Sequence, residues 1–208
     1  MISDLKQHYK NLLNQYGPSP EAVQHINTES QYKRFEILSE IAPEMDSIID
    51  VGCGLGDMFQ FLNLNDFKGK YLGLDFIPEF VELSNQHFKE HKNAQFKVCD
   101  LLSDSIPQGY DYILLSGVFN NNQEDNEEFM LSTIKKMFDS SQKGIAFNAM
   151  STYVDFQDSN LYYSDPLKVF DFCKRNLTRR IVLKHDYLVK EGSIPFEYTM
   201  YLYKEDKV

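Results

Sequence analysis

The 208-residue sequence contains no tryptophan, only three cysteines and no long apolar run. Cys53, Cys99 and Cys173 are widely spaced and form no C-x-x-C pair, so neither a disulfide framework nor a metal site is expected. No apolar stretch approaches the roughly 20 residues that span a membrane. The amino-terminal residues lack the apolar core of a signal peptide, and we therefore expect a cytoplasmic protein.

Basic residues are also scarce, since 21 Lys and Arg stand against 31 Asp and Glu and give a net charge of -10. A protein that binds nucleic acid through its phosphates favours the opposite sign. The small basic group formed by Arg179, Arg180 and Lys184 is typical of a solvated edge strand. The composition predicts no nucleic-acid partner and no membrane partner, and it favours a small-molecule or protein substrate.

Strand and helix patterns alternate along the chain, which is typical of an α/β domain built around a mainly parallel sheet. The first five predicted strands are residues 47–51, 71–75, 95–99, 110–115 and 144–148. Two further apolar runs, 180–185 and 196–203, are joined by a turn without a helix and should pair antiparallel. Helical patterns cover residues 5–16, 28–41, 78–88, 127–138 and 165–173.

The most informative segment joins the first predicted strand to a helix-like segment. The strand ends in Asp50, and glycines then alternate at Gly52, Gly54 and Gly56. Glycine adopts backbone dihedrals that other residues avoid and lets the backbone approach a ligand closely. The following helix offers free N–H groups to an anionic group. This arrangement predicts a crevice for a nucleoside-bearing cofactor.

Acidic residues end three successive predicted strands. They are Asp50 (or Asp57 just beyond the loop), Asp75 and Asp100. The carboxyl ends of parallel strands line the ligand crevice of an open α/β sheet. Asp75 follows the last loop glycine by 19 residues, where an acid can accept hydrogen bonds from ribose hydroxyls. Each acid alone is also typical of a turn or cap, but the set beside a glycine loop favours a cofactor site.

These segments resemble the motifs of the class I S-adenosylmethionine-dependent methyltransferases over nearly the full chain. The matching stretches are Asp50-Val51-Gly52-Cys53-Gly54-Leu55-Gly56, Leu72-Gly73-Leu74-Asp75, Cys99-Asp100-Leu101, and Tyr110-Asp111-Tyr112-Ile113 through Ser116-Gly117. Three other stretches resemble a group of small bacterial methyltransferases within that class, namely Tyr16-Gly17-Pro18-Ser19-Pro20, Asn148-Ala149-Met150-Ser151-Thr152-Tyr153 and His185-Asp186-Tyr187. A nicotinamide-dependent dehydrogenase is disfavoured, because its G-x-G-x-x-G fingerprint places the last glycine one residue further along.

The resemblance implies a three-layer Rossmann-like sandwich with a seven-stranded, mainly parallel sheet whose last strand is antiparallel. It implies one methyltransferase domain over residues 1–208. Within that domain we expect an N-terminal helical cap (1–44), a cofactor-binding core (45–150), and an acceptor-side helix with a terminal strand hairpin (151–208).

The resemblance also implies S-adenosylmethionine as cofactor and assigns residues to its parts. The methionine end would lie against Asp50 and the loop, the ribose against Asp75, the adenine against Phe76 or Ile77, and the adenine amino group beside Asp100. We expect the segment around Gln31 and Arg34 to close the site; the alternative is an ordinary helix with Arg34 in a salt bridge. The full set is Asp50, Gly52, Cys53, Gly54, Gly56, Asp75, Phe76, Ile77, Asp100, Leu101, Ser116, Gly117, Gln31 and Arg34.

Catalytic residues are harder to predict, because the sulfonium is already a good leaving group and the enzyme mainly orients the reactants. A base is needed only when the acceptor arrives protonated. The candidates are His185, whose ordinary pKa near 6.5 suits a base, together with Asn148 and Tyr153. A structural histidine bonded to Asp186 or to backbone is the alternative for His185. Tyr153, Tyr162 and Tyr163 are expected to form either an aromatic acceptor pocket or a packed lid.

The expected activity is methyl transfer to the oxygen or nitrogen of a small molecule. A partner subunit that binds the cofactor without transferring the methyl group and a protein methyltransferase are the alternatives. The sequence determines neither the acceptor nor the oligomeric state.

Overall fold

A seven-stranded sheet forms the centre of the protein in the computed structural model, which describes residues 2–17, 28–122 and 124–205. The strand order is β3-β2-β1-β4-β5-β7-β6. The five strands from β3 to β5 are parallel, whereas β7 runs antiparallel to both β5 and β6. The strands are β1 (Ser47–Val51), β2 (Lys70–Asp75), β3 (Ala94–Val98), β4 (Tyr110–Leu115), β5 (Ser141–Met150), β6 (Ile181–Lys184) and β7 (Glu197–Tyr203). The predicted sheet with a reversed last strand is confirmed.

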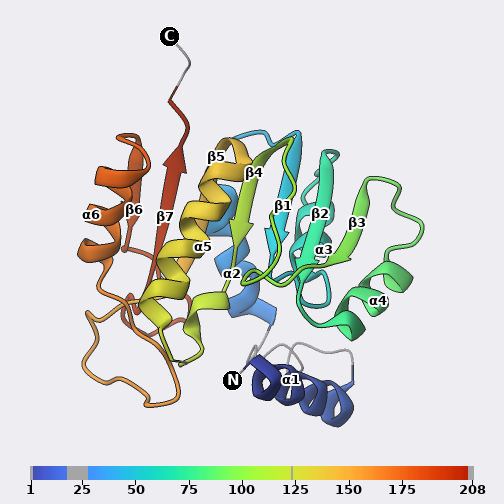
Figure 1. Ribbon diagram of the computed structural model, residues 1–208, viewed down its shortest axis with the longest axis horizontal. Coiled ribbons are helices and arrows are strands. Elements are labelled where there is room, and N and C mark those ends of the chain that lie inside the picture. The colour runs from blue at the N-terminus through green and yellow to red at the C-terminus, as the bar shows by residue number, and fades with distance from the viewer. Residues whose placement is uncertain (1, 18–27, 123, 206–208) are drawn as a thin grey trace.

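Helices cover both faces of this sheet (Figure 1). Because side chains alternate along a strand, Ile49 of β1 packs in one core cluster with α5 and α6, while Ile48 packs in a second with α2, α3 and α4. The helices are α1 (Ile2–Tyr16), α2 (Thr28–Ser39), α3 (Asp57–Leu64), α4 (Pro78–His87), α5 (Asn126–Ser140) and α6 (Pro166–Asn176), with a short 3₁₀ turn η2 (Val118–Asn120). This three-layer arrangement confirms the predicted sandwich.

Local signals placed several helix starts correctly. At α6, Asp165 accepts a hydrogen bond from the Leu167 N–H at 2.9 Å, and Pro166 occupies the first helical turn. A side-chain cap followed by proline is a favoured way to begin a helix, because it satisfies one free donor and removes another.

Sheet pairing changes the length of two predicted strands most. β5 is longer than the predicted residues 144–148, since it pairs with β4 from Ser141 and with β7 as far as Met150. β6 is shorter than residues 180–185, because this edge strand has a single neighbour and its pairing ends at Lys184. His185 therefore lies just beyond the strand rather than within it.

The carboxyl ends of β1, β2, β3 and β4 meet at one edge of the sheet, and α1 lies across that edge (Figure 1). This is where ligands bind in open α/β sheets. No helix in the described ranges is long and apolar enough to cross a membrane.

Candidate functional site

A cavity of about 800 Å³ opens at the carboxyl edge of the sheet. Its volume lies in the upper part of the range of roughly 300–1,000 Å³ that small-molecule sites occupy. Every residue predicted for the cofactor lines it except Gly56 and Ile77. The cavity brings together Gln31, Arg34, Asp50, Gly52, Cys53, Gly54, Asp75, Phe76, Asp100, Leu101, Ser116 and Gly117.

The glycine loop between β1 and α3 has the left-handed backbone that its sequence suggested. Gly52 and Gly54 have φ values of 74° and 52° and line the cavity. A Cβ atom on Gly52 would lie 2.3 Å from Cγ2 of Val118, so a side chain at this position is excluded. Gly56, with φ 84°, directly precedes α3, and a Cβ atom at this position would lie 2.6 Å from the Phe88 ring. It therefore serves the packing of the loop rather than the cavity surface.

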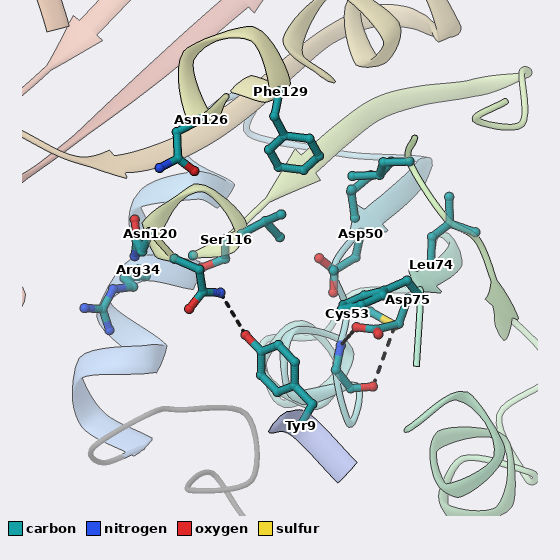
Figure 2. A pocket seen from close by; sticks show the side chains of 18 of the residues that line it. Tyr9, Arg34, Asp50, Cys53, Leu74, Asp75, Ser116, Asn120, Asn126 and Phe129 are labelled. Carbon is teal, nitrogen blue, oxygen red and sulfur yellow. Dashed lines mark hydrogen bonds between the residues drawn. The ribbon is translucent and has the colours of Figure 1, made fainter. Parts of the chain in front are cut away.

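Asp75 at the end of β2 joins two of the loops around the cavity. The Gly54 N–H donates to its Oδ2 at 2.9 Å (Figure 2). The Ile77 N–H donates to its Oδ1, also at 2.9 Å. Burial raises the pKa of Asp75 to about 6, although these backbone donors act in the opposite direction. The Ile77 side chain is fully buried in the core, so Phe76 is the residue of this pair that faces the cavity.

Asp50 and Asp57 both line the cavity, so both of the alternative acids near the glycine loop belong to it. Asp50 is 2% exposed and accepts a 2.5 Å hydrogen bond from the Tyr71 hydroxyl. Burial raises the pKa of Asp50 to about 7, and the nearby Asp75 and Asp57 act in the same direction. Asp57 accepts a hydrogen bond from Gln31 Nε2 at 3.0 Å, which ties α2 to α3.

Asp100, at the end of β3, lies on the same cavity wall and is more exposed. Its Oδ1 accepts a hydrogen bond from the Leu102 N–H at 3.0 Å, and its Oδ2 lies 3.9 Å from Lys6 Nζ on α1. The ion pair connects the first helix to the edge of the sheet that carries the cavity.

Tyr9 of α1 is a cavity residue that sequence reasoning missed. Its ring packs edge-to-face against Phe76 and Phe80, with centroids 6.2 and 6.0 Å apart. Its hydroxyl accepts a hydrogen bond from Asn121 Nδ2 at 3.1 Å (Figure 2). Burial raises the pKa of Tyr9 to about 12, so it is protonated at neutral pH. Helical spacing predicted α1, but no signal in the sequence connects this helix to the loop after β4.

A buried ion pair closes another side of the cavity. Arg34 of α2 donates from Nη2 to Glu197 Oε1 at 2.6 Å and from Nε to both carboxylate oxygens at 3.0 Å. The side chains are 14% and 1% exposed, and both residues line the cavity. Arg34 therefore makes the salt bridge that the sequence left as the alternative, and it also lines the cavity. Glu197 was not predicted, because the pair spans 163 positions of sequence.

The three catalytic candidates are not among the residues that line this cavity. Asn148 is 1% exposed and accepts a hydrogen bond from the Gly117 N–H at 2.8 Å, so it supports the loop after β4. Tyr153 is 56% exposed. The His185 ring lies 6.2 Å from the rings of Tyr153 and Tyr198.

The three tyrosines proposed for an acceptor pocket do not reach the main cavity either. Tyr162 and Tyr163 line a separate pocket of about 260 Å³ beside α5 and α6. Asn120 and Asn121, on the loop after β4, do line the main cavity.

A seven-stranded sheet with one reversed strand, and a glycine loop and acids converging at its carboxyl edge, define the class I S-adenosylmethionine-dependent methyltransferases. Residues 44–178 match the family described as "Methyltransferase domain", and the chain belongs to this family. S-adenosylmethionine is the cofactor of the class.

Known proteins agree with this assignment. Rv1506c of Mycobacterium tuberculosis (strain ATCC 25618 / H37Rv), a protein named for an inferred methyltransferase activity, is 34% identical over 154 residues, covering 71% of this chain and 90% of its own. Magnesium protoporphyrin IX methyltransferase from Synechocystis PCC 6803, solved with bound SAH, has a TM-score of 0.69 at 12% identity and 99% and 100% coverage. N-methyltransferase NodS from Bradyrhizobium japonicum WM9, also solved with SAH, has a TM-score of 0.67 at 15% identity and 96% and 99% coverage. The two solved structures share the fold.

Proposed function

We propose that the chain transfers the methyl group of S-adenosylmethionine to an oxygen or nitrogen of a small-molecule acceptor. The observation that carries the proposal is the convergence of Asp50, Asp75 and the glycine loop on one cavity, opposite the polar loop that follows β4 (Figure 2). The cavity volume of about 800 Å³ supports room for an acceptor beside the cofactor.

The cavity residues fit this cofactor. Gly52 lacks the side chain that would strike Val118, which leaves backbone open to a close ligand. Asp75 can accept hydrogen bonds from ribose hydroxyls beside the two backbone donors that orient it. Asp50 is buried, and none of the groups that shift its pKa is a cation. A sulfonium or ammonium nearby would therefore favour its charged form.

The other parts of the cofactor are assigned to cavity residues from the family resemblance. The methionine end would lie along Asp50 and the glycine loop, and the adenine between Phe76 and the Asp100 loop. Ser116 and Gly117 would line the floor of the cavity near the sulfonium. Gln31 and Arg34 would close the site from α2.

The cofactor supplies a methyl group on a positively charged sulfur, and the protein's task is to hold, orient and shield the reactants. Asn148 acts indirectly, because it accepts a hydrogen bond from the Gly117 N–H and donates one to Ser116 Oγ at 3.4 Å. Tyr9 covers the edge of the cavity and limits the access of water. These groups position the reactants, and none of them needs to accept a proton.

We also propose the division of the domain into a cap (1–44), a cofactor-binding core (45–150) and an acceptor-side part (151–208). Tyr9, Gln31 and Arg34 of the cap line the cavity, which supports its covering role; residues 18–27 lie outside the described residues. Phe196 and Glu197 reach the cavity from the third part.

One structural neighbour supports a small acceptor, because it is named for magnesium protoporphyrin IX. Another is named as an N-methyltransferase, which supports nitrogen as a possible methyl acceptor.

The proposal is tested by calorimetry with S-adenosylmethionine and S-adenosylhomocysteine, followed by a methyl-release assay over a panel of hydroxyl and amine metabolites. We expect both cofactor forms to bind and adenosylhomocysteine to be released with some panel members. If neither form binds the pure protein, the proposal fails. Binding with no release from any small molecule, but with label appearing on proteins, would favour the protein methyltransferase.

Cofactor affinity should also depend on pH. Asp75 and Asp50 have pKa values raised to about 6 and about 7, so both are protonated in acid and carry charge above neutrality. The charged forms are the ones that accept ribose hydrogen bonds and face the sulfonium. We therefore expect the dissociation constant for S-adenosylmethionine to rise roughly tenfold or more as the pH falls from about 8 to about 5.5.

Calorimetry across that pH range measures this effect, and Asp50→Asn provides the comparison. The variant should bind weakly at all pH values and keep only the pH dependence that Asp75 contributes. A wild-type affinity that is flat over this range would contradict the role of both carboxyls.

A further inference from the structure

The cavity wall is strongly acidic. Eight carboxylates line it, whereas Arg34 is the only Lys or Arg among the described residues that do so. The carboxylates belong to Asp50, Asp57, Asp75, Asp100, Glu124, Asp125, Glu128 and Glu197. Four of them follow from the cofactor motifs, and the other four are not needed to explain cofactor binding.

Arg34 offsets the charge of Glu197 and leaves the other seven carboxylates without a basic side chain among the described residues that line the cavity. Its guanidinium makes two-pronged contact with Glu197, from Nε and Nη2, at 2.6 to 3.0 Å. A carboxylate bonded in this way neutralises the guanidinium and occupies the donors that would otherwise recognise an anionic ligand. The cavity therefore contains no basic side chain, within the described part of the chain, that is available to an acceptor carboxylate or phosphate.

Two buried polar atoms at the cavity lack a hydrogen-bond partner among the described residues, namely Gln31 Oε1 and Asn120 Oδ1. Gln31 is 3% exposed and lines the cavity, while its Nε2 is engaged with Asp57. Both unpartnered atoms are hydrogen-bond acceptors. Because buried polar groups are almost always satisfied, an N–H or O–H donor on a bound molecule would suit both atoms.

Asn120, Glu124, Asp125 and Glu128 follow β4, away from the glycine loop and Asp75, whereas Gln31 bonds to Asp57 beside that loop. Asn120 and Arg34 lie across the cavity from Asp50 and Asp75 (Figure 2). Glu124, Asp125 and Glu128 are exposed on the loop before α5 and on its first turn, where an incoming molecule would meet them. Their charge attracts a cation and repels an anion before either is bound.

We propose that the methyl acceptor is an amine, recognised by this carboxylate-lined, acceptor-rich side of the cavity, and that anionic acceptors are excluded. The inference rests on the proposed function and narrows it to N-methylation. This side of the cavity favours a positive charge and hydrogen-bond donors. An amine provides both, since its protonated form is a cation and its N–H groups are donors. A hydroxyl acceptor bearing a carboxylate or phosphate would place a like charge beside Glu124, Asp125 and Glu128.

The chemical step balances without a further reactant. The neutral amine nitrogen forms a bond to the methyl carbon as the carbon–sulfur bond breaks, and the electron pair of that bond stays on sulfur. The products are adenosylhomocysteine and a methylated ammonium, which carries the positive charge that the sulfur loses. The protonated amine that the carboxylates attract must lose its proton before the attack, so transfer should rise with pH as the neutral fraction grows.

Two probes of matched size and shape test the proposal, phenethylamine and phenylacetate. Each is titrated by calorimetry into the full chain saturated with adenosylhomocysteine, at low and at high salt. We expect phenethylamine to bind about tenfold more tightly than phenylacetate at low salt, with the difference shrinking at high salt because exposed charges are screened. Methyl transfer to phenethylamine and butylamine is then compared with transfer to the matching acids.

A triple variant with Glu124→Gln, Asp125→Asn and Glu128→Gln should remove most of the preference for the amine. The matched control carries Glu44→Gln, Asp66→Asn and Glu90→Gln, which remove the same charge from exposed positions that do not line the cavity. The control should keep the wild-type preference, and both variants should keep their affinity for adenosylhomocysteine.

The outcomes separate the two proposals. If adenosylhomocysteine binds but phenylacetate binds as tightly as phenethylamine, the amine acceptor is overturned and the methyltransferase function stays in place. The same conclusion follows if adenosylhomocysteine binds and no amine does. Equal loss of the preference in the triple variant and in the control also overturns it, since net charge alone would then explain the effect. Failure of adenosylhomocysteine to bind overturns both.

Discussion

Replacing Asp75 with alanine should weaken binding of S-adenosylmethionine by roughly 1.5–3 kcal/mol, or about 10- to 150-fold. The carboxylate is 6% exposed and faces the cavity, so its loss removes charge-assisted hydrogen bonds to the ribose. It also releases the Gly54 and Ile77 N–H groups, which orient the loops after β1 and β2. The second effect places the expected loss in the upper part of the range. Calorimetry with the cofactor and with adenosylhomocysteine measures it.

Asp165→Ala is the matched control. Its Oδ1 accepts a hydrogen bond from the backbone N–H two residues on, at 2.9 Å, as Asp75 does, but it lies outside the main cavity at the start of α6. This variant should lose some stability and bind the cofactor like the wild type. Unchanged affinity in Asp75→Ala would remove this residue from the ribose site.

Replacing Glu197 with alanine should cost roughly 3 kcal/mol of unfolding free energy, near the lower end of the range for breaking a buried ion pair. The change leaves the Arg34 guanidinium, whose side chain is 14% exposed, without its carboxylate in a largely desolvated place. In a domain of this size, 1 kcal/mol corresponds to about 2–4 °C in Tm, so thermal unfolding should shift by roughly 6–12 °C.

The pair Arg175–Asp171 provides a control with the same chemistry at the surface. Arg175 Nε donates to both oxygens of Asp171 at 2.7 Å, but the side chains are 75% and 60% exposed. Asp171→Ala should therefore change stability by less than about 1 kcal/mol.

A double variant isolates the cost of the unpaired charge. Arg34→Met with Glu197→Leu removes both charged groups and should recover most of the stability that Glu197→Ala loses. If Glu197→Ala melts like the wild type, or if the double variant is no more stable than the single one, the stability does not depend on the pairing of this buried charge.

The cofactor half of the site was predictable because its signals are local in sequence. A strand, a glycine turn and a helix follow one another between residues 47 and 64, and their order alone places Gly52 and Gly54 at the carboxyl edge of the sheet. Asp75 and Asp100 could be assigned in the same way, since each ends a strand that must run parallel to β1. The seven-stranded sheet followed from the alternation of patterns and from the turn between the last two strands.

The other half depended on contacts between distant residues, which no local pattern reports. Tyr9 meets Asn121 across 112 positions, and Arg34 meets Glu197 across 163. The positions of the catalytic candidates likewise depended on packing. Asn148 accepts a hydrogen bond from the backbone of the loop after β4, and His185 lies beyond the end of an edge strand, so neither lines the main cavity. The sequence by itself determined the class of protein and the cofactor motifs, because these rest on short segments with defined backbone geometry. Only the tertiary structure decided which charges line the remaining wall and which of them are already paired, because packing sets both.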